Sequence, residues 1–261
     1  MEHTTNTRLE IEGGVALLTI DRPKALNALN TETLRELHNH LDHLALQGEV
    51  KVVVLTGAGA KSFVAGADIR EMKDMNPQQA LAFSETGQAL MLKLRALPQP
   101  TIAAVNGFAL GGGCELAMAC DLLFAASNAK FGQPEINLGV LPGFGGTQRM
   151  SRHLGAQATK YLCLTGDTIS AEEAHRLGLV LAVFPAETFL TEVKAIAAKI
   201  AAKPPLAATA IKRVVDQGAE VDLDRSLTLE TQAFALSFST ADQKEGMAAF
   251  VEKRPAIFKG C

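Results

Sequence analysis

The chain has 261 residues, of which 48% are hydrophobic, and its formal net charge at pH 7 is −3. A chain of this length and composition can bury a large core without cross-links. Lysines and arginines are scattered along the chain, which argues against a nucleic-acid-binding surface. The apolar runs are far shorter than the roughly 20 residues that a membrane-spanning helix needs.

The polar start of the chain, Met1 to Thr7, has neither an apolar stretch nor an arginine-rich amphipathic pattern, so we predict no export or transit signal. The four cysteines show no C-x-x-C spacing and no nearby histidine cluster, which argues against a metal site and against a disulfide framework. We therefore predict a cytoplasmic protein with reduced thiols, no bound metal and no membrane association.

Taken in chain order, five short runs of apolar or β-branched residues predict strands, because Gly, Pro or Asn bound them and polar alternation is weak. Strands that are buried on both faces have this pattern. The runs are Val15–Ile20, Val52–Thr56, Thr101–Val105, Asp121–Ala126 and Leu179–Phe184.

Helical patterns lie between these runs. The first repeats an apolar residue on one helical face, at Leu34, Leu37, Leu41 and Leu44. The second is an amphipathic stretch between Pro77 and Pro98. Alternating strands and helices predict an α/β core built from repeated ββα or βα turns.

The strand signal disappears past about residue 200. Pro204 and Pro205 open a stretch with helical patterns only, in which Thr240 and Gln243 have the spacing of a capping box. Such helices have too little apolar surface to be stable alone, so we expect them to dock on the core or on another subunit. We predict a core over residues 1–200 and a helical oligomerisation region over residues 201–261.

Two glycine-containing segments have the composition of ligand-binding turns. Ala65-Gly66-Ala67-Asp68-Ile69 follows the strand-like run Lys61–Val64, and its small residues could expose a peptide N–H to a bound oxygen. Gly111-Gly112-Gly113 stands before a helix-like run that contains Glu115, and helix N-termini carry free N–H donors. Ordinary tight turns are the alternative for both segments.

Two glutamates next to restricted backbone suggest acid/base chemistry. Glu115 follows the triple glycine, and Glu135 follows Pro134. Paired carboxylates suit proton transfer, and two N–H donors from separate glycine-flanked segments suit an oxyanion hole. Taken singly, a solvated helix residue is an equally good interpretation of Glu115, and a loop carboxylate is an equally good interpretation of Glu135.

Other motifs fit less well. Ala60 stands where a phosphate-binding P-loop needs glycine before Lys61. No segment completes G-x-G-x-x-G, and no G-x-S-x-G nucleophile elbow is present. His38, His40 and His43 lack the carboxylate of an H-E-x-x-H metal motif, so we interpret them as a solvated helix face.

Taken together, five segments in order resemble the enoyl-CoA hydratase (crotonase) family: Asp21–Leu29, Ala65–Ile69, Asn106–Leu116, Phe131–Glu135 and Leu141–Arg149. The resemblance implies an α/β fold, a crotonase-like spiral of ββα turns with a C-terminal α-helical region used in trimer contacts. It also implies a homo-oligomer, either a trimer or a hexamer.

The same resemblance implies roles for single residues. The backbone N–H groups of Ala67 and Gly112 would form an oxyanion hole for the thioester oxygen. Glu115 would hold and activate the water that attacks C3, and Glu135 would exchange the proton at C2. The implied reaction is hydration of a 2-trans-enoyl-CoA to the 3-hydroxyacyl-CoA, and its reverse.

Coenzyme A is implied as part of the acyl-CoA substrate, and no separate cofactor is expected. The residues implied to lie along it are Lys24, Ala25, Leu26, Ala65, Gly66, Asp68, Ile69 and Gly111. For Lys24, an ordinary lysine in a polar loop is the alternative to a phosphate contact.

Several alternatives stay open. A carboxylate pair does not specify the acyl group, so an enoyl-CoA isomerase or a specialised hydratase, for example one for methylglutaconyl-CoA, is the nearest alternative. One branch of the family binds RNA, which the unremarkable charge of this chain disfavours. Phe144 stands where many short-chain hydratases have a smaller residue, which leaves the acyl-chain preference open.

Overall fold

The structure is a computed structural model that describes residues 5–261. The first four residues, which contributed to the prediction of no export signal, lie outside this range. The strands are β1 (Thr7–Glu12), β2 (Val15–Ile20), β3 (Val52–Gly57), β4 (Ser62–Val64), β5 (Thr101–Val105), β6 (Phe108–Leu110), β7 (Leu122–Ala126), β8 (Lys130–Gly132), β9 (Thr168–Ser170) and β10 (Ala182–Phe184).

The α-helices fill most of the intervals between the strands and the whole C-terminal part. They are α1 (Thr31–Ala45), α2 (Ile69–Met72), α3 (Pro77–Ala96), α4 (Gly112–Met118), α5 (Gly146–Thr165), α6 (Ala171–Arg176), α7 (Phe189–Ala201), α8 (Pro205–Gly218), α9 (Leu223–Ser237) and α10 (Ala241–Glu252). Two 3₁₀ helices, η1 (Pro23–Ala25) and η2 (Pro134–Leu138), lie beside the candidate site.

The strands form two sheets. The larger has the order β1-β2-β3-β5-β7-β10, and it is parallel except for the antiparallel pair β1/β2. The smaller has the order β4-β6-β8-β9. The pairs β3/β4, β5/β6 and β7/β8 each place one strand in each sheet before the next helix, so the predicted spiral of ββα turns is confirmed.

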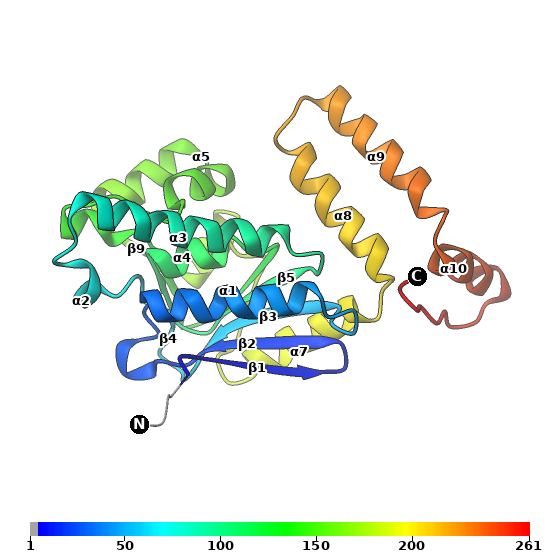
Figure 1. Cartoon of the computed structure of the whole chain (residues 1–261), viewed down its shortest axis with the longest axis horizontal. Coiled ribbons are helices and arrows are strands. Elements are labelled where there is room, and N and C mark those ends of the chain that lie inside the picture. Colours follow the sequence, from blue (N-terminus) through cyan, green and yellow to red (C-terminus); the bar gives the residue numbers. More distant parts are fainter. Residues whose placement is uncertain (1–4) are drawn as a thin grey trace.

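Both faces of the larger sheet are covered, as the apolar runs predicted. On one face, α1 and α3 pack side by side (Figure 1). They contribute leucines such as Leu37 and Leu90 to the main core. On the other face, Phe189 and Val193 of α7 pack against Val54 of β3 and its neighbours. This double burial explains why these strands lack polar alternation.

The five predicted strands are confirmed as β2, β3, β5, β7 and β10, with β10 shorter than expected. The smaller sheet was largely missed, because β6, β8 and β9 have only three residues each. A strand of three residues has no periodicity to detect, and its pairing partners are remote in sequence. Among the described residues, none of the helices combines the length and apolar character needed to cross a lipid bilayer.

The C-terminal helices form an arm at one side of the core, and α8 and α9 run back along each other (Figure 1). The proposed boundary between residues 200 and 201 lies at the last residue of α7, a few residues before α8 begins. Thr240 caps α10 by accepting a hydrogen bond from the Gln243 N–H at 3.1 Å, as its spacing predicted. The chain end returns to this cap, where the Ala241 N–H donates to the Cys261 carbonyl oxygen at 2.8 Å.

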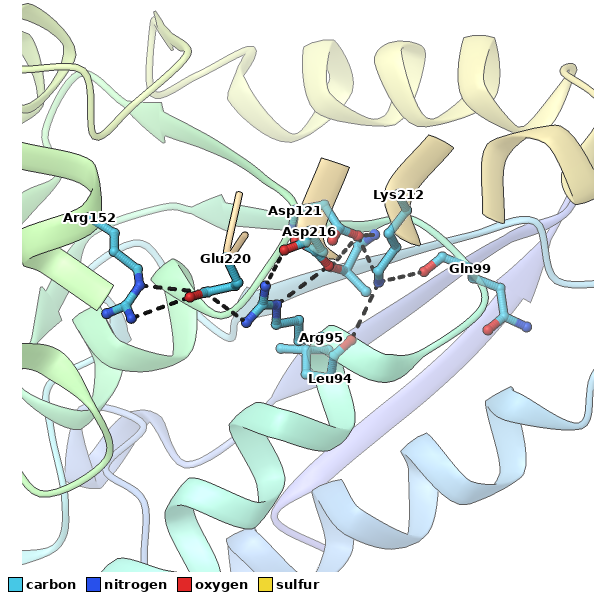
Figure 2. A network of polar contacts seen from close by, with 9 residues as sticks. Leu94, Arg95, Gln99, Asp121, Arg152, Lys212, Asp216 and Glu220 are labelled. Carbon is cyan, nitrogen blue, oxygen red and sulfur yellow. Dashed lines mark hydrogen bonds and ion pairs between the residues drawn. The ribbon is translucent and has the colours of Figure 1, made fainter. Parts of the chain in front are cut away.

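A buried lysine fastens α8 to the core (Figure 2). The Nζ of Lys212 lies 2.9 Å from Oδ2 of Asp121 and donates to the Gln99 carbonyl oxygen at 3.1 Å. Asp121 also accepts from the Thr101 N–H at 2.6 Å, at the start of β5. Since Lys212 is only 8% exposed, this contact is sheltered from water. The arm is therefore joined to the sheet through charge rather than through a large apolar seam.

Candidate active site

The start of α4 depends on glycine. Gly111, the residue before this helix, has φ 49° and ψ −122°, a conformation that other residues adopt only under strain. Two positions later, a Cβ on Gly113 would overlap the Val64 carbonyl group of β4. The glycines therefore bring the first turn of α4, with its unpaired N–H groups, against the smaller sheet.

The peptide of Ala67 faces the same place. Leu29 makes a parallel bridge with Ala67, in which the Leu29 N–H donates to the Gly66 carbonyl and the Asp68 N–H donates to the Leu29 carbonyl, both at 2.8 Å. In such a bridge the N–H of Ala67 itself points away from Leu29. A Cβ on Gly112 would lie 3.4 Å from the Ala67 nitrogen, so the two predicted oxyanion donors are neighbours.

Glu115 is buried on the first turn of α4 and is only 1% exposed. Its Oε1 accepts from the Phe144 N–H at 2.8 Å and from the Gly146 N–H at 2.6 Å. Gly146 is the first residue of α5, so Glu115 satisfies the N-terminus of a second helix. These two bonds fix one oxygen of the carboxylate and its orientation.

Glu135 lies on η2, directly after Pro134, and is partly buried. The fully buried Gln133 holds the Glu135 carboxylate in place. With the Gln133 amide oriented to satisfy its hydrogen bonds, its nitrogen donates to Oε1 and Oε2 of Glu135 at 3.1 and 3.2 Å. A Cβ on Gly111 would lie 2.5 Å from Oε1 of Glu135. The carboxylate therefore reaches the glycine that precedes the oxyanion donor Gly112.

The two carboxyl groups interact electrostatically. Burial and, to a lesser extent, the nearby charge of Glu135 raise the pKa of Glu115 to about 7, against the opposing effect of the N–H donors of Gly146 and Phe144. Burial also raises the pKa of Glu135 to about 7. Coupled groups of this kind share protons, so near neutral pH the pair can both accept and supply one.

Phe144 forms a wall of this site. Its ring is 3% exposed and packs on Phe83 of α3 with centroids 5.3 Å apart. A Cβ on Gly87 would overlap the ring, so α3 needs glycine at that position. On the other side, a Cβ on Gly112 would lie 3.3 Å from Cδ2 of Phe144. The ring thus borders the oxyanion donors.

The two segments predicted to lie along coenzyme A are adjacent. The Ala65 N–H donates to the Leu26 carbonyl oxygen at 3.1 Å, which joins the loop at Lys24–Leu26 to the turn at Ala65–Ile69. Lys24 and Ile69 are exposed. The carboxylate of Asp68, in contrast, pairs with Arg22 at 3.0 Å, so it faces the protein rather than solvent.

Sequence reasoning missed three contributors to this site. Gln133 and Arg149 lie inside motifs that were singled out, yet only the glutamate of the first motif was given a role. Arg149 donates from Nη1 to the Phe144 carbonyl oxygen at 2.9 Å and holds the turn before α5. Arg22 likewise lies inside the motif Asp21–Leu29, yet it was given no role. Within residues 5–261, no group of three His, Cys, Asp or Glu side chains could hold a metal ion.

Comparisons with known proteins identify the family of the chain. The family model for enoyl-CoA hydratase/isomerase matches residues 10–261. A short-chain-enoyl-CoA hydratase from Clostridium acetobutylicum is 51% identical over 95% of each chain, and a crotonyl-CoA hydratase from Syntrophomonas wolfei is 51% identical over 97% of each. A crystal structure of an enoyl-CoA hydratase from Bacillus anthracis superposes with a TM-score of 0.95, at 40% identity, over 98% of this chain and all of that one. The chain therefore belongs to the enoyl-CoA hydratase/isomerase family.

Proposed function

We propose that this protein adds water across the double bond of a 2-trans-enoyl-CoA and catalyses the reverse dehydration. The observation that carries the proposal is the convergence of two carboxyl groups, Glu115 and Glu135, with the backbone N–H groups of Ala67 and Gly112. The hydratase names of relatives that are 51% identical over nearly the whole chain support the same reaction.

In the proposed mechanism, the two N–H groups bind the thioester oxygen. A thioester alone leaves C3 weakly electrophilic, and hydrogen bonds that strengthen as negative charge builds on the oxygen stabilise the enolate-like transition state. Loss of one such donor typically raises a barrier by about 3 kcal/mol. The first turn of α4 adds the favourable dipole of a helix N-terminus at the same place.

The two carboxyl groups then take different parts in the addition of water. Glu115 holds the water through its free oxygen and takes a proton as the water oxygen bonds to C3. Glu135 supplies the proton that bonds to C2, so one proton enters the pair and one leaves it. The raised pKa values of about 7 support this exchange, because both protonation states are accessible near neutral pH.

The acyl group is proposed to be short. Phe144 is held by Phe83 on one side and borders Gly112 on the other, so its ring limits the space beside the oxyanion donors. The names of the two relatives, a short-chain-enoyl-CoA hydratase and a crotonyl-CoA hydratase, support a short acyl group. Coenzyme A is proposed to lie along the exposed loop at Lys24 and the turn at Ala65–Ile69, and no separate cofactor is required.

A homo-oligomer, either a trimer or a hexamer, is part of the proposal. The arm exposes large apolar side chains on all three of its helices, for example Ile211, Phe234 and Phe250, the last of which is 85% exposed. Exposed patches of this kind commonly mark interfaces. Sedimentation velocity of the full chain tests the assembly. The free thiols of the chain suit a reducing compartment, and cell fractionation tests the proposed cytoplasmic location.

The decisive experiment follows the enone absorbance of crotonyl-CoA with the wild-type protein, Glu115→Gln and Glu135→Gln. We expect both amide variants to lose about 10²- to 10⁴-fold in kcat, the range typical of an acid or base. Glu172→Gln, which changes an exposed glutamate on α6, is the matched control and should retain full activity.

Two results would contradict the proposal. A wild-type protein that does not hydrate enoyl-CoA of any short or medium chain length would refute the activity. An amide variant with near wild-type turnover would refute the two-carboxylate mechanism even if the activity is present.

A further inference from the structure

A salt bridge between Arg22 and Asp68 lies beside Ala67. Nη2 of Arg22 lies 3.0 Å from Oδ2 of Asp68, and the two side chains are 18% and 16% exposed. The other end of the guanidinium, Nη1, donates to the Ala28 carbonyl oxygen. The planar fork of this arginine therefore joins the 22–28 loop to the 65–68 turn across 46 residues of sequence.

Ala28 and Asp68, the two residues that Arg22 contacts, lie next to the Leu29–Ala67 bridge. Ala28 precedes Leu29, whose N–H and carbonyl hold the peptides on both sides of Ala67. Asp68 follows Ala67 directly. Arg22 thus ties the strand-like segment at Leu29 to the turn at Ala67, and a relative shift of the two would change the direction of the Ala67 N–H.

The backbone of the 22–28 loop needs such support. Leu26 and Asn27 have φ values of 51° and 59°, in the left-handed region that non-glycine residues occupy at a cost. The Arg22 N–H donates to Oδ1 of Asn27 at 2.9 Å, and Nδ2 of Asn27 donates to the Ser62 carbonyl oxygen at 2.8 Å. The largely buried salt bridge between Arg22 and Asp68 adds a charge-assisted hydrogen bond of defined direction to these contacts.

Asp68 has a second, separable task. Its Oδ1 accepts from the Arg70 N–H at 3.2 Å and so caps α2, while Oδ2 meets Arg22. Asparagine is as good a helix cap as aspartate but carries no charge. Asp68→Asn therefore weakens the tie to Arg22 while it keeps the cap and the shape of the side chain.

We propose that Arg22 and Asp68 are positioning residues that set the direction of the Ala67 N–H and thereby the polarisation of the bound thioester carbonyl. This inference rests on the proposed function, because it assigns the Ala67 N–H to the thioester oxygen. Neither side chain takes part in proton transfer. Their effect reaches the substrate only through the peptide of Ala67.

The test separates carbonyl polarisation from catalysis. Cinnamoyl-CoA, whose double bond is conjugated to an aryl ring, serves as the probe, because its absorption band moves to longer wavelength when the carbonyl is polarised. We expect Arg22→Lys and Asp68→Asn to reduce this shift on binding by at least about half and to lower kcat for crotonyl-CoA by about 10- to 100-fold, a part of what a lost oxyanion donor costs. The KM should change by less than about 3-fold, since a positioning effect falls mainly on the transition state.

Two controls frame the result. Glu115→Gln should keep the full band shift while it loses turnover. Arg176→Met removes a bidentate arginine pair with Glu173 on the exposed face of α6 and should change neither readout. The thermal midpoint of each variant identifies loss of folding, and the isosteric Asp68→Asn carries the test if Arg22→Lys is unstable.

An unchanged band shift in a folded Asp68→Asn protein would overturn the inference, whatever happens to kcat. A larger KM with an unchanged kcat would overturn it as well, because that pattern belongs to a residue that binds coenzyme A. Failure of the proposed function is a different outcome: the wild-type protein would then not hydrate crotonyl-CoA, while the band shift still reports on Ala67.

Discussion

The spiral core and the C-terminal arm are held together in different ways. In the core, backbone segments approach so closely that glycine is required, as where Gly113 meets the Val64 carbonyl group. In the arm, large apolar side chains such as Phe234 remain exposed, and α9 contains no buried residue. The arm is joined to the core by charged groups, with Lys212 and Asp121 at the centre (Figure 2).

The difference shows where precision is needed. The candidate site requires backbone N–H groups at defined places, and only close packing of main chain can supply them. The arm needs attachment but not atomic precision, and its apolar surface remains exposed. More peripheral ion pairs extend the attachment, from Arg95 to Glu220 and from Arg152 to Glu220 at 3.6 and 3.5 Å, and such pairs contribute little each.

The largest expected effect comes from breaking the close approach in the core. Gly113→Ala places a methyl group on the Val64 carbonyl, and neither backbone can yield without moving β4 or α4. We expect a loss of more than about 4 kcal/mol in unfolding free energy, as for severe overpacking. Chemical denaturation measures it. Gly48→Ala, where a Cβ has no neighbour within 4 Å, is the control, and equal stability of the two variants would contradict the packing argument.

The next effect separates the arm from the core. Lys212→Met leaves Asp121 without its buried partner and removes the bond to Gln99, at a cost of about 3 to 5 kcal/mol. Hydrogen exchange should show α8 losing protection while the larger sheet keeps it. Arg225→Met, which removes an exposed pair within the arm, should have no measurable effect. Equal loss of protection in the sheet and α8 would show that the two regions unfold as one.

The pH dependence of stability should differ in sign between the two regions. Burial raises the pKa of Glu115 and of Glu135 from 4.5 to about 7, so between these values the folded protein binds more protons than the unfolded chain. The free energy of unfolding therefore falls as pH rises from about 4.5 to about 7, by at most about 3 kcal/mol per carboxyl. In the arm, hydrogen bonds from Arg254 lower the pKa of Glu245 to about 2, so its contribution is lost as pH falls from 4.5 toward 2.

Denaturation at a series of pH values checks the sign. Glu135→Gln should flatten the decline between pH 4.5 and 7 and leave the acid limb unchanged. Glu245→Gln should do the reverse. A decline that persists unchanged in Glu135→Gln would contradict the assignment of that proton uptake to the site.

The smallest effect concerns substrate choice. Phe144→Leu replaces the ring beside Gly112 with a smaller side chain. We expect kcat/KM for hexenoyl-CoA, divided by kcat/KM for crotonyl-CoA, to rise by about 10-fold, which corresponds to about 1.4 kcal/mol. Parallel assays with both thioesters measure it. Phe189→Leu makes the same change on the opposite face of the larger sheet and should leave the ratio unchanged. An unchanged ratio in Phe144→Leu would show that Phe144 does not line the acyl pocket.

The sequence by itself determined what local patterns can specify. The buried strands of the larger sheet, the amphipathic α1 and α3, and the cap at Thr240 were all predictable, because each is encoded by neighbours within a few residues. The two glutamates and the glycine turns could be singled out from residue types. The resemblance of five ordered motifs to one family then supplied their proposed roles.

Only the tertiary structure decided how these pieces meet. Three kinds of contact join segments 20 or more residues apart. They are the pairing of the three-residue strands in the smaller sheet, the hydrogen bonds from the Phe144 and Gly146 N–H groups to Glu115, and the salt bridge between Arg22 and Asp68. The docking of α8 by Lys212 spans more than 110 residues. Such contacts leave no periodic trace in the sequence, because their geometry exists only after the spiral has brought remote backbone together.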